Sequence, residues 1–105
     1  MGKVTIRSKI PFKVIDSFQR SSNTEGVEVD TTEDKVILQI TKQFATPGYS
    51  MDVDEVIKEN NECIISLSIK PPKVDAMLMQ VITNKTIVIE IDKEKLGTFK
   101  QVKLK

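Results

Sequence analysis

Hydrophobic and polar residues alternate along several stretches of the chain, which is the pattern of β-strands with one buried face. From Lys35 to Thr41, the residues Val36, Leu38 and Ile40 share one face, and Ile37 is the exception on the other. The same alternation predicts strands over residues 49–57, 63–69 and 87–91. In the last of these the β-branched Ile87, Ile89 and Ile91 suit a buried pleated face.

Turn residues separate these strands. Asn60-Asn61 supplies two residues that tolerate positive φ and therefore predicts a hairpin between residues 57 and 63. Pro71-Pro72 ends the return strand, because two prolines fix φ and remove two backbone donors. The apolar run Met77–Ile82 predicts a strand, with a short helix as the alternative, and Asn84-Lys85 predicts a turn after it.

The two ends of the chain are less regular. Short strands are expected at Val4–Ile6 and Phe12–Ile15, separated by Pro11, which favours a bend or a sheet edge. Residues 17–34 are polar and predict a loop, within which residues 26–30 can form a short strand. After Gly97, a lysine-rich final segment predicts an edge strand.

Seven or eight short strands without a helix or a repeat favour an all-β fold, an antiparallel β-sandwich, over a partly open barrel. The alternation Ile65-Ser66-Leu67-Ser68-Ile69 needs one dry and one wet face, as a two-layer sandwich provides. A length of 105 residues predicts a single domain over residues 1–105.

Composition excludes several classes of partner. The chain has 16 basic and 15 acidic residues, and its lysines are scattered, so no concentrated positive surface for nucleic acid is expected. Four Phe, one Tyr and no Trp give little material for stacking bases. No apolar run reaches the length of a signal peptide or a membrane span.

Candidate catalytic and metal-binding residues have stronger structural interpretations. Asp52, Asp54 and Glu55 resemble a calcium cluster, but they lack a wrapping loop and fit a solvated strand face. The single Cys63 has no histidine in the chain to activate it, and its alternation places it in the core as a compact apolar side chain. No zinc motif and no hydrolase motif is present. We therefore expect no enzyme activity, no cofactor and no metal.

Two further motifs have competing interpretations. Asn84-Lys85-Thr86 fits the N-glycosylation sequon, but a turn is the preferred interpretation of these residues. Met51, Met77 and Met79 could line an adaptable binding surface, although methionine at strand spacing favours filling of the core.

The segment from residue 43 to 50 has more specific turn chemistry than a connection needs. Thr46-Pro47-Gly48 combines a hydroxyl, a fixed φ and a residue free to take positive φ, and Phe44 and Tyr49 add aromatic area beside it. A stiff loop loses little entropy on docking, so a recognition role is one interpretation. In the other, Tyr49 packs beneath the turn and has only a structural role.

From residue 36 to 92, the order of the motifs resembles the PrcB C-terminal family, named for protease complex subunit PrcB. The motifs are Thr46-Pro47-Gly48-Tyr49-Ser50, the hairpin of residues 51–57 and 63–70, Pro71-Pro72, and Gln80–Thr83 followed by Ile87–Ile91. Ile10-Pro11-Phe12 is similar to an upstream strand of that family. The resemblance implies a bacterial, often exported, accessory protein that associates with or stabilises a protease complex, without catalysis.

Three departures from the family pattern bear on this inference. Pro47 stands where the family usually has glycine, which changes the shape of the loop. Asn84 stands where proline is frequent, and residues 17–34 are shorter than the usual upstream region.

The same Thr-x-Gly-Tyr turn is similar to the loop of chagasin-type cysteine-peptidase inhibitors, which are immunoglobulin-like sandwiches. Only Thr46, Gly48 and Tyr49 carry over, because Phe44-Ala45 replaces most of the motif that precedes them in that family. This resemblance implies a peptidase inhibitor as the alternative function.

Together these observations predict a protein-binding module, a monomer or weak dimer, with a peptidase as the expected partner. Its predicted contact residues lie in two segments: Phe44, Thr46, Pro47, Gly48 and Tyr49 in the first, Pro71 and Pro72 in the second.

Overall fold

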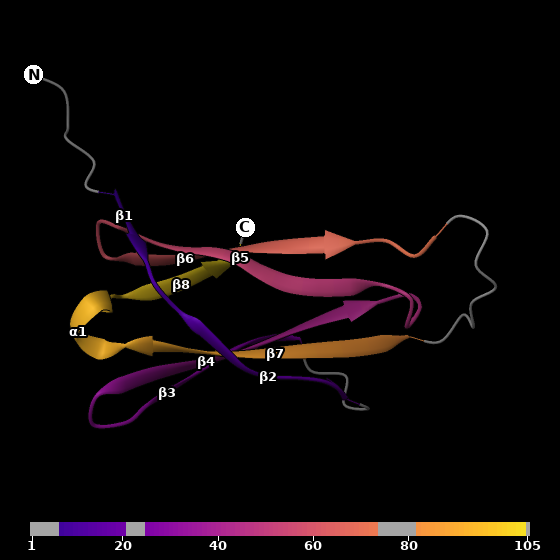
Figure 1. Ribbon diagram of the computed structural model, residues 1–105, viewed down its shortest axis with the longest axis horizontal. Coiled ribbons are helices and arrows are strands. Elements are labelled where there is room, and N and C mark those ends of the chain that lie inside the picture. Colours follow the sequence, from indigo (N-terminus) through magenta and orange to yellow (C-terminus); the bar gives the residue numbers. More distant parts are fainter. Residues whose placement is uncertain (1–6, 21–24, 74–81, 105) are drawn as a thin grey trace, which may run out of the picture.

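The chain forms two stacked β-sheets, shown as an upper and a lower layer in Figure 1. This computed structural model describes residues 7–20, 25–73 and 82–104, so the strand expected at residues 4–6 and most of the run at 77–82 lie outside the described residues. The elements are β1 Arg7–Ile10, β2 Lys13–Arg20, β3 Gly26–Thr31, β4 Lys35–Phe44, β5 Ser50–Glu59, β6 Glu62–Lys70, β7 Thr83–Asp92, α1 Lys93–Leu96 and β8 Gln101–Leu104.

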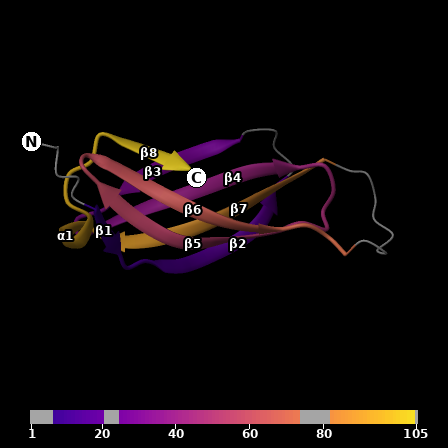
Figure 2. The same ribbon diagram turned by 90° about the horizontal axis from the view of Figure 1, so that it is seen from above.

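The predicted all-β sandwich is confirmed. The upper sheet has the order β1-β5-β6-β8, and the lower sheet has the order β2-β7-β4-β3. Seen from above in Figure 2, β8 lies over β3 and β6 lies over β4. One pair departs from the expected antiparallel arrangement, since β8 runs parallel to β6. The reason is the connection from β7, which crosses between the sheets through the one-turn helix α1 and so brings β8 in alongside β6 in the same direction.

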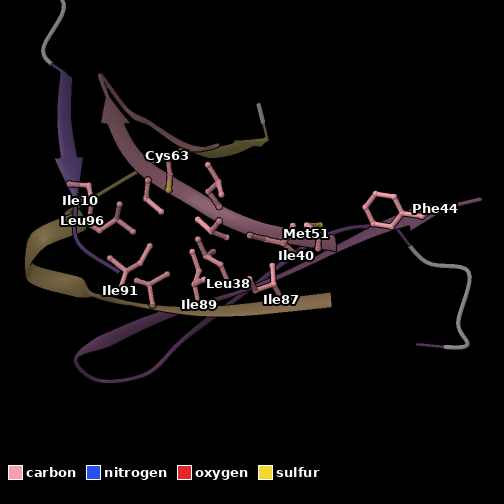
Figure 3. Close-up of a cluster of buried hydrophobic side chains, with 14 residues drawn as sticks. Ile10, Leu38, Ile40, Phe44, Met51, Cys63, Ile87, Ile89, Ile91 and Leu96 are labelled. Atoms are coloured by element: carbon pink, nitrogen blue, oxygen red, sulfur yellow. The ribbon is translucent and has the colours of Figure 1, made fainter. Parts of the chain in front are cut away.

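The core lies between the sheets and is built on a matched set of branched side chains. The register of β4 and β7 pairs Val36 with Ile91, Leu38 with Ile89, and Ile40 with Ile87. Figure 3 shows the side chains of the upper sheet, among them Met51 and Cys63, facing Leu38, Ile40, Ile87, Ile89 and Ile91. The placement of Met51 and Cys63 in the core is as expected, whereas Met77 and Met79 lie outside the described residues.

A β-bulge in β5 changes which of its side chains face the core. The register between β5 and β6 shifts between Val53 and Glu55, where Asp54 is the extra residue. Without this shift Glu55 would continue the inward face of Met51 and Val53. With it, Val56 is fully buried against the core, and Ile57, expected on the core face, pairs with Ile64 on the outer face.

Two expected connections are strands instead. Asn84 and Lys85 do not form a turn: they belong to β7, where both β2 and β4 pair with them. Because β7 is a central strand, its outer face is also covered: Thr86 is buried, and its hydroxyl lies 2.8 Å from that of Thr41. Asn84 is likewise buried, which also removes the sequon from the surface.

The other correction concerns residues 17–20, which continue β2 as an edge strand of the lower sheet rather than entering a loop. A strand with both faces largely exposed to water shows no apolar alternation, so its polar sequence resembles a loop. The predicted strand at residues 26–30 is confirmed as β3, and the Asn60-Asn61 hairpin is confirmed with Asn60 at φ 56°.

Pro11 lies where the chain passes from one sheet to the other. β1 pairs with β5 in the upper sheet, and β2, two residues later, pairs with β7 in the lower sheet. Proline has no N–H to leave unpaired, so it suits the residue at which one ladder stops and another begins.

We expect Leu38→Ala to lower the free energy of unfolding by about 2–5 kcal/mol, because it leaves a cavity among fully buried residues. Ile15→Ala is the matched control, since Ile15 is 44% exposed on the edge strand β2 and should cost less than about 1 kcal/mol. Urea unfolding of both variants measures the difference, and equal losses would contradict this description of the core.

Candidate partner-binding site

The predicted recognition loop connects the two sheets at one end of the sandwich. β4 of the lower sheet ends at Phe44, and β5 of the upper sheet begins at Ser50. Residues 45–49 therefore span the gap between the layers, at the end opposite α1 (Figure 1). A five-residue crossing of this kind must be well packed to keep its shape, because no strand supports it.

An aromatic stack holds the two ends of this loop together. The rings of Phe44 and Tyr49 lie with their centroids 5.1 Å apart and their planes inclined by 17°. Phe44 belongs to the buried core, and Tyr49 packs against it. The ammonium of Lys85, on the inward face of β7, donates a hydrogen bond to the backbone carbonyl of Tyr49. These contacts agree with the structural interpretation of Tyr49, and its role in recognition stays a prediction. Lys85 is a supporting residue that was not predicted, because it was expected in a turn.

Burial divides the predicted contact residues into two groups. Phe44 and Thr46 are buried, at 9% and 7% exposure, so their side chains offer little surface to a partner. The Thr46 hydroxyl has no hydrogen-bond partner in the described part of the chain. Pro47, Gly48 and Tyr49 are half-buried, and Ala45, which was not predicted, is exposed. Among the described glycines, positive φ occurs at Gly26 and Gly97, so the turn does not use that freedom of Gly48.

The second predicted segment lies beside the first. Ser50 and Lys70 are paired residues at the end of the β5–β6 ladder, so Tyr49 and Pro71 are the next residues outward on neighbouring strands. Pro71 is exposed and Pro72 is half-buried. The structure therefore brings both segments together at one end of the molecule. We call the end surface the set of accessible residues there: Ala45, Pro47, Gly48, Tyr49, Pro71 and Pro72.

The remaining candidate groups, a thiol and two carboxylates, are not part of this end surface. Cys63 is fully buried in the core, and burial raises the pKa of its thiol to about 11, with Lys58 acting weakly in the opposite direction. Asp52 and Asp54 are exposed on β5. No group of three or more potential metal ligands occurs in residues 7–20, 25–73 and 82–104.

Charged residues surround a hollow of 510 Å³ at the opposite end of the sandwich. It is lined by Glu33, Asp34, Lys35, Asp92, Lys93 and Glu94. Lys35 donates a hydrogen bond to Asp92, which raises the pKa of the lysine and lowers that of the carboxyl. The interaction joins β4 to the end of β7. It is an exposed ion pair between two of the charged residues that line the hollow.

A family model for the PrcB C-terminal region matches residues 35–92, which is more than half of the chain. The chain belongs to the PrcB C-terminal family. The match begins with β4 and ends with β7, so it includes the crossing loop, the β5–β6 hairpin and Pro71-Pro72. No curated protein and no solved structure matches the chain. The described helix is too short and too polar to cross a membrane.

The family match confirms the resemblance inferred from the order of the motifs. The first departure from the family pattern, Pro47, lies at a half-buried position in the crossing loop. The second, Asn84, lies in β7, where a proline would remove a backbone donor from a central strand. In this member of the PrcB C-terminal family, β7 is therefore paired through Asn84 on both sides.

The Phe44–Tyr49 stack can be tested with a double-mutant cycle. Phe44→Leu, Tyr49→Leu and the double variant should give a coupling free energy of about 0.5–1.5 kcal/mol in urea unfolding, as measured for other aromatic pairs. Tyr49→Phe is the control, because it keeps the ring and should leave stability nearly unchanged. Additive losses in the double variant would show that the two rings do not support each other.

The buried Cys63 thiol makes the free energy of unfolding depend on pH between the ordinary thiol pKa of 9.0 and its raised value of about 11. Since the folded pKa is about 11 and the ordinary value is 9.0, the unfolded chain loses the proton first, and the contribution present below pH 9 is lost as the pH rises to 11. We expect Cys63→Val to lose less stability than the original protein over this interval. Urea unfolding of both proteins at several pH values measures the difference, and parallel curves would show that the thiol is not protected by burial.

Proposed function

We propose that this protein is a non-catalytic protein-binding module that serves as an accessory or stabilising subunit of a bacterial protease complex. Membership of the PrcB C-terminal family is the observation that carries this proposal, because the family is named for a subunit of such a complex. The absence of histidine and the complete burial of the single thiol agree with a role in binding rather than in catalysis.

The end surface is the proposed contact region for the peptidase. Ala45 and Pro71 are its exposed members, and they lie on segments that two strands and an aromatic stack hold in place. Prolines at residues 47, 71 and 72 restrict the backbone before binding, so little conformational entropy remains to be lost. Phe44 and Thr46 contribute by supporting the loop from beneath rather than by touching the partner.

The alternative, a chagasin-like inhibitor acting through the loop of residues 43–50, has less support from the side chains. Of the three residues that carry that resemblance, Thr46 is buried, and Gly48 and Tyr49 are half-buried. Insertion into a peptidase cleft would require this short, packed crossing to protrude. The accessory role is therefore better supported by the side chains, and inhibition is the second outcome that the same experiment tests.

Substitution of the exposed residues tests the proposal without disturbing the core. The double variant Ala45→Asp, Pro71→Asp should retain the fold and lose most of its association with a peptidase, by about tenfold or more, because a charge is buried unpaired in the contact. The control is Asn61→Asp, Thr98→Asp, which adds the same charge at two exposed positions near α1.

The measurement is the peptidase activity retained on each immobilised protein after exposure to extract from the organism that encodes the chain. Activity retained by the original protein and the control, and lost with the double variant, supports an accessory subunit that contacts the enzyme at the end surface. Retained enzyme that cleaves substrate only after it is released from the protein supports inhibition. Equal peptidase activity retained by all three proteins would show that the contact lies outside the end surface.

A further inference from the structure

The upper sheet is only half as wide at one end as at the other. β5 and β6 pair along their whole lengths, but β1 pairs only with residues 56–59 of β5 and β8 only with residues 62–65 of β6. The half of this sheet that approaches the end surface therefore consists of β5 and β6 alone among the described strands. The lower sheet keeps β2, β7, β4 and β3 beneath it, as Figure 2 shows.

The segment Ser66–Lys70 is therefore an unpaired edge that continues the ladder of β8. Leu104 pairs with Ile65, and no described strand lies beside the next five residues of β6 on that side. Within the described part of the chain, no strand pairs with the backbone N–H and C=O groups here that point away from β5. An edge of this kind is the usual template for strand addition.

Apolar side chains gather along this edge between the sheets. Ile69 faces inward opposite its neighbour Met51 but is 40% exposed, and Val29 on the inward face of β3 is 48% exposed. Leu67, Val27 and Leu104 pack against the core and remain partly buried. Since β6 lies over β4 in Figure 2 and β3 pairs with β4, β3 lies on the side of the free edge of β6. A strand added beside β6 would cover these side chains.

The edges of β2, β3 and β5 carry bulges or charged residues, which usually prevent strand addition. β2 has a register shift at Ile15 and carries Lys13 and Asp16, and the described free edge of β3 carries Glu28 and Asp30. The free part of β5 carries Asp52 and Asp54, and the hollow between it and β2 is lined largely by polar residues. Ser66–Ile69 has neither a charge, a proline nor a bulge. Among the described free edges of β2, β3, β5 and β6, this edge is the one without such a feature before its last residue, Lys70.

We propose that Ser66–Lys70 binds an extended segment of a partner protein, which adds to the upper sheet in line with β8. The segment would place small branched apolar side chains inward at alternate positions, over Leu67 and Ile69. On the outer face it would place a carboxylate beside Lys70, which forms no ion pair with the described residues. This goes beyond the proposed function, because it requires neither the crossing loop nor a peptidase.

A single segment fits this edge better than a second copy of the chain. β3 extends beneath the free edge, one strand further out than β4, which underlies β6. A second sandwich presenting its own strand in the same plane would bring its lower sheet against β3 before that strand reached Ser66–Lys70. An isolated extended segment carries no second layer and meets no such obstacle.

A tail added after Lys105 tests the edge without a separate partner. The described register of β8 and β6 ends with Leu104 opposite Ile65, and a tail that continues it would have its first and third residues opposite Leu67 and Ile69. The matched tail is valine, glutamate, valine, glutamate, threonine, which places valine inward and a glutamate beside Lys70. The shifted tail is glutamate, valine, glutamate, valine, threonine, with the same composition and the valines turned to solvent.

We expect the matched tail to slow amide hydrogen exchange in Ser66–Lys70 by about tenfold or more, and the shifted tail to leave it unchanged. Ile69→Glu in the chain with the matched tail should abolish the protection, whereas Ile82→Glu, at an exposed residue outside this edge, should not. Equal protection by both tails, or none, would overturn the proposal.

The same two sequences supplied as separate blocked peptides to the original chain test binding in trans. Shifts of the Ser66–Lys70 amide resonances with the matched peptide alone support a partner segment. Shifts along Lys13–Arg20 instead would assign strand addition to β2 and overturn the proposal. Protection of Ser66–Lys70 that rises with protein concentration, without any peptide, would mean that a second copy occupies the edge and would also overturn it. Because the end-surface variants do not enter these measurements, the two proposals can fail separately.

Discussion

The packing of branched side chains from β4 and β7 against β5 and β6 is the constraint on which the rest of the structure depends. Val36, Leu38 and Ile40 pair laterally with Ile91, Ile89 and Ile87, so one continuous apolar surface spans the two central strands of the lower sheet. Within this chain the two sheets are joined by the core and by crossing segments, since each ladder stays within its own sheet. The distance between the layers, and hence the span of the crossing loop, follows from this packing.

That constraint also explains the main differences between the sequence-based expectations and the fold. Local alternation predicted β4, β6 and the centre of β7, because the residues that face the core recur with a period of two in these strands. Asn84-Lys85 has the composition of a turn, but pairing on both sides holds it in a strand. The bulge at Asp54 could not be predicted from alternation, because it interrupts the alternation: after Val53 the inward face continues at Val56 instead of Glu55. The polar edge strand β2 and the parallel entry of β8 depend on partners distant in sequence.

The segments of the candidate site could be predicted from the sequence. Which of their residues are accessible to a partner and which support the loop from within could not. The stiff segment around Pro47 and the pair Pro71-Pro72 were predicted as contact residues, and the β5–β6 register places them side by side. Turn chemistry does not reveal which side chains of a crossing loop face the core. Phe44 and Thr46 are buried because the loop passes over the end of the sandwich, and Lys85 reaches the Tyr49 carbonyl from a strand that the sequence placed in a turn.

The pairing of β2 with β7 has a consequence for the order in which the chain can be assembled. Residues 13–20 are synthesised well before their partners, residues 84–90. During translation, which adds about 5–20 residues per second, β2 must wait until residues 84–90 have been made before its ladder can close. Ladders between such distant segments form slowly, because the loop must close before any contact compensates for the lost entropy. Until then Val14 and Ile15 lie on a strand without a neighbour, so the newly made chain passes through a period in which it depends on dilution or on chaperones to avoid pairing with other chains.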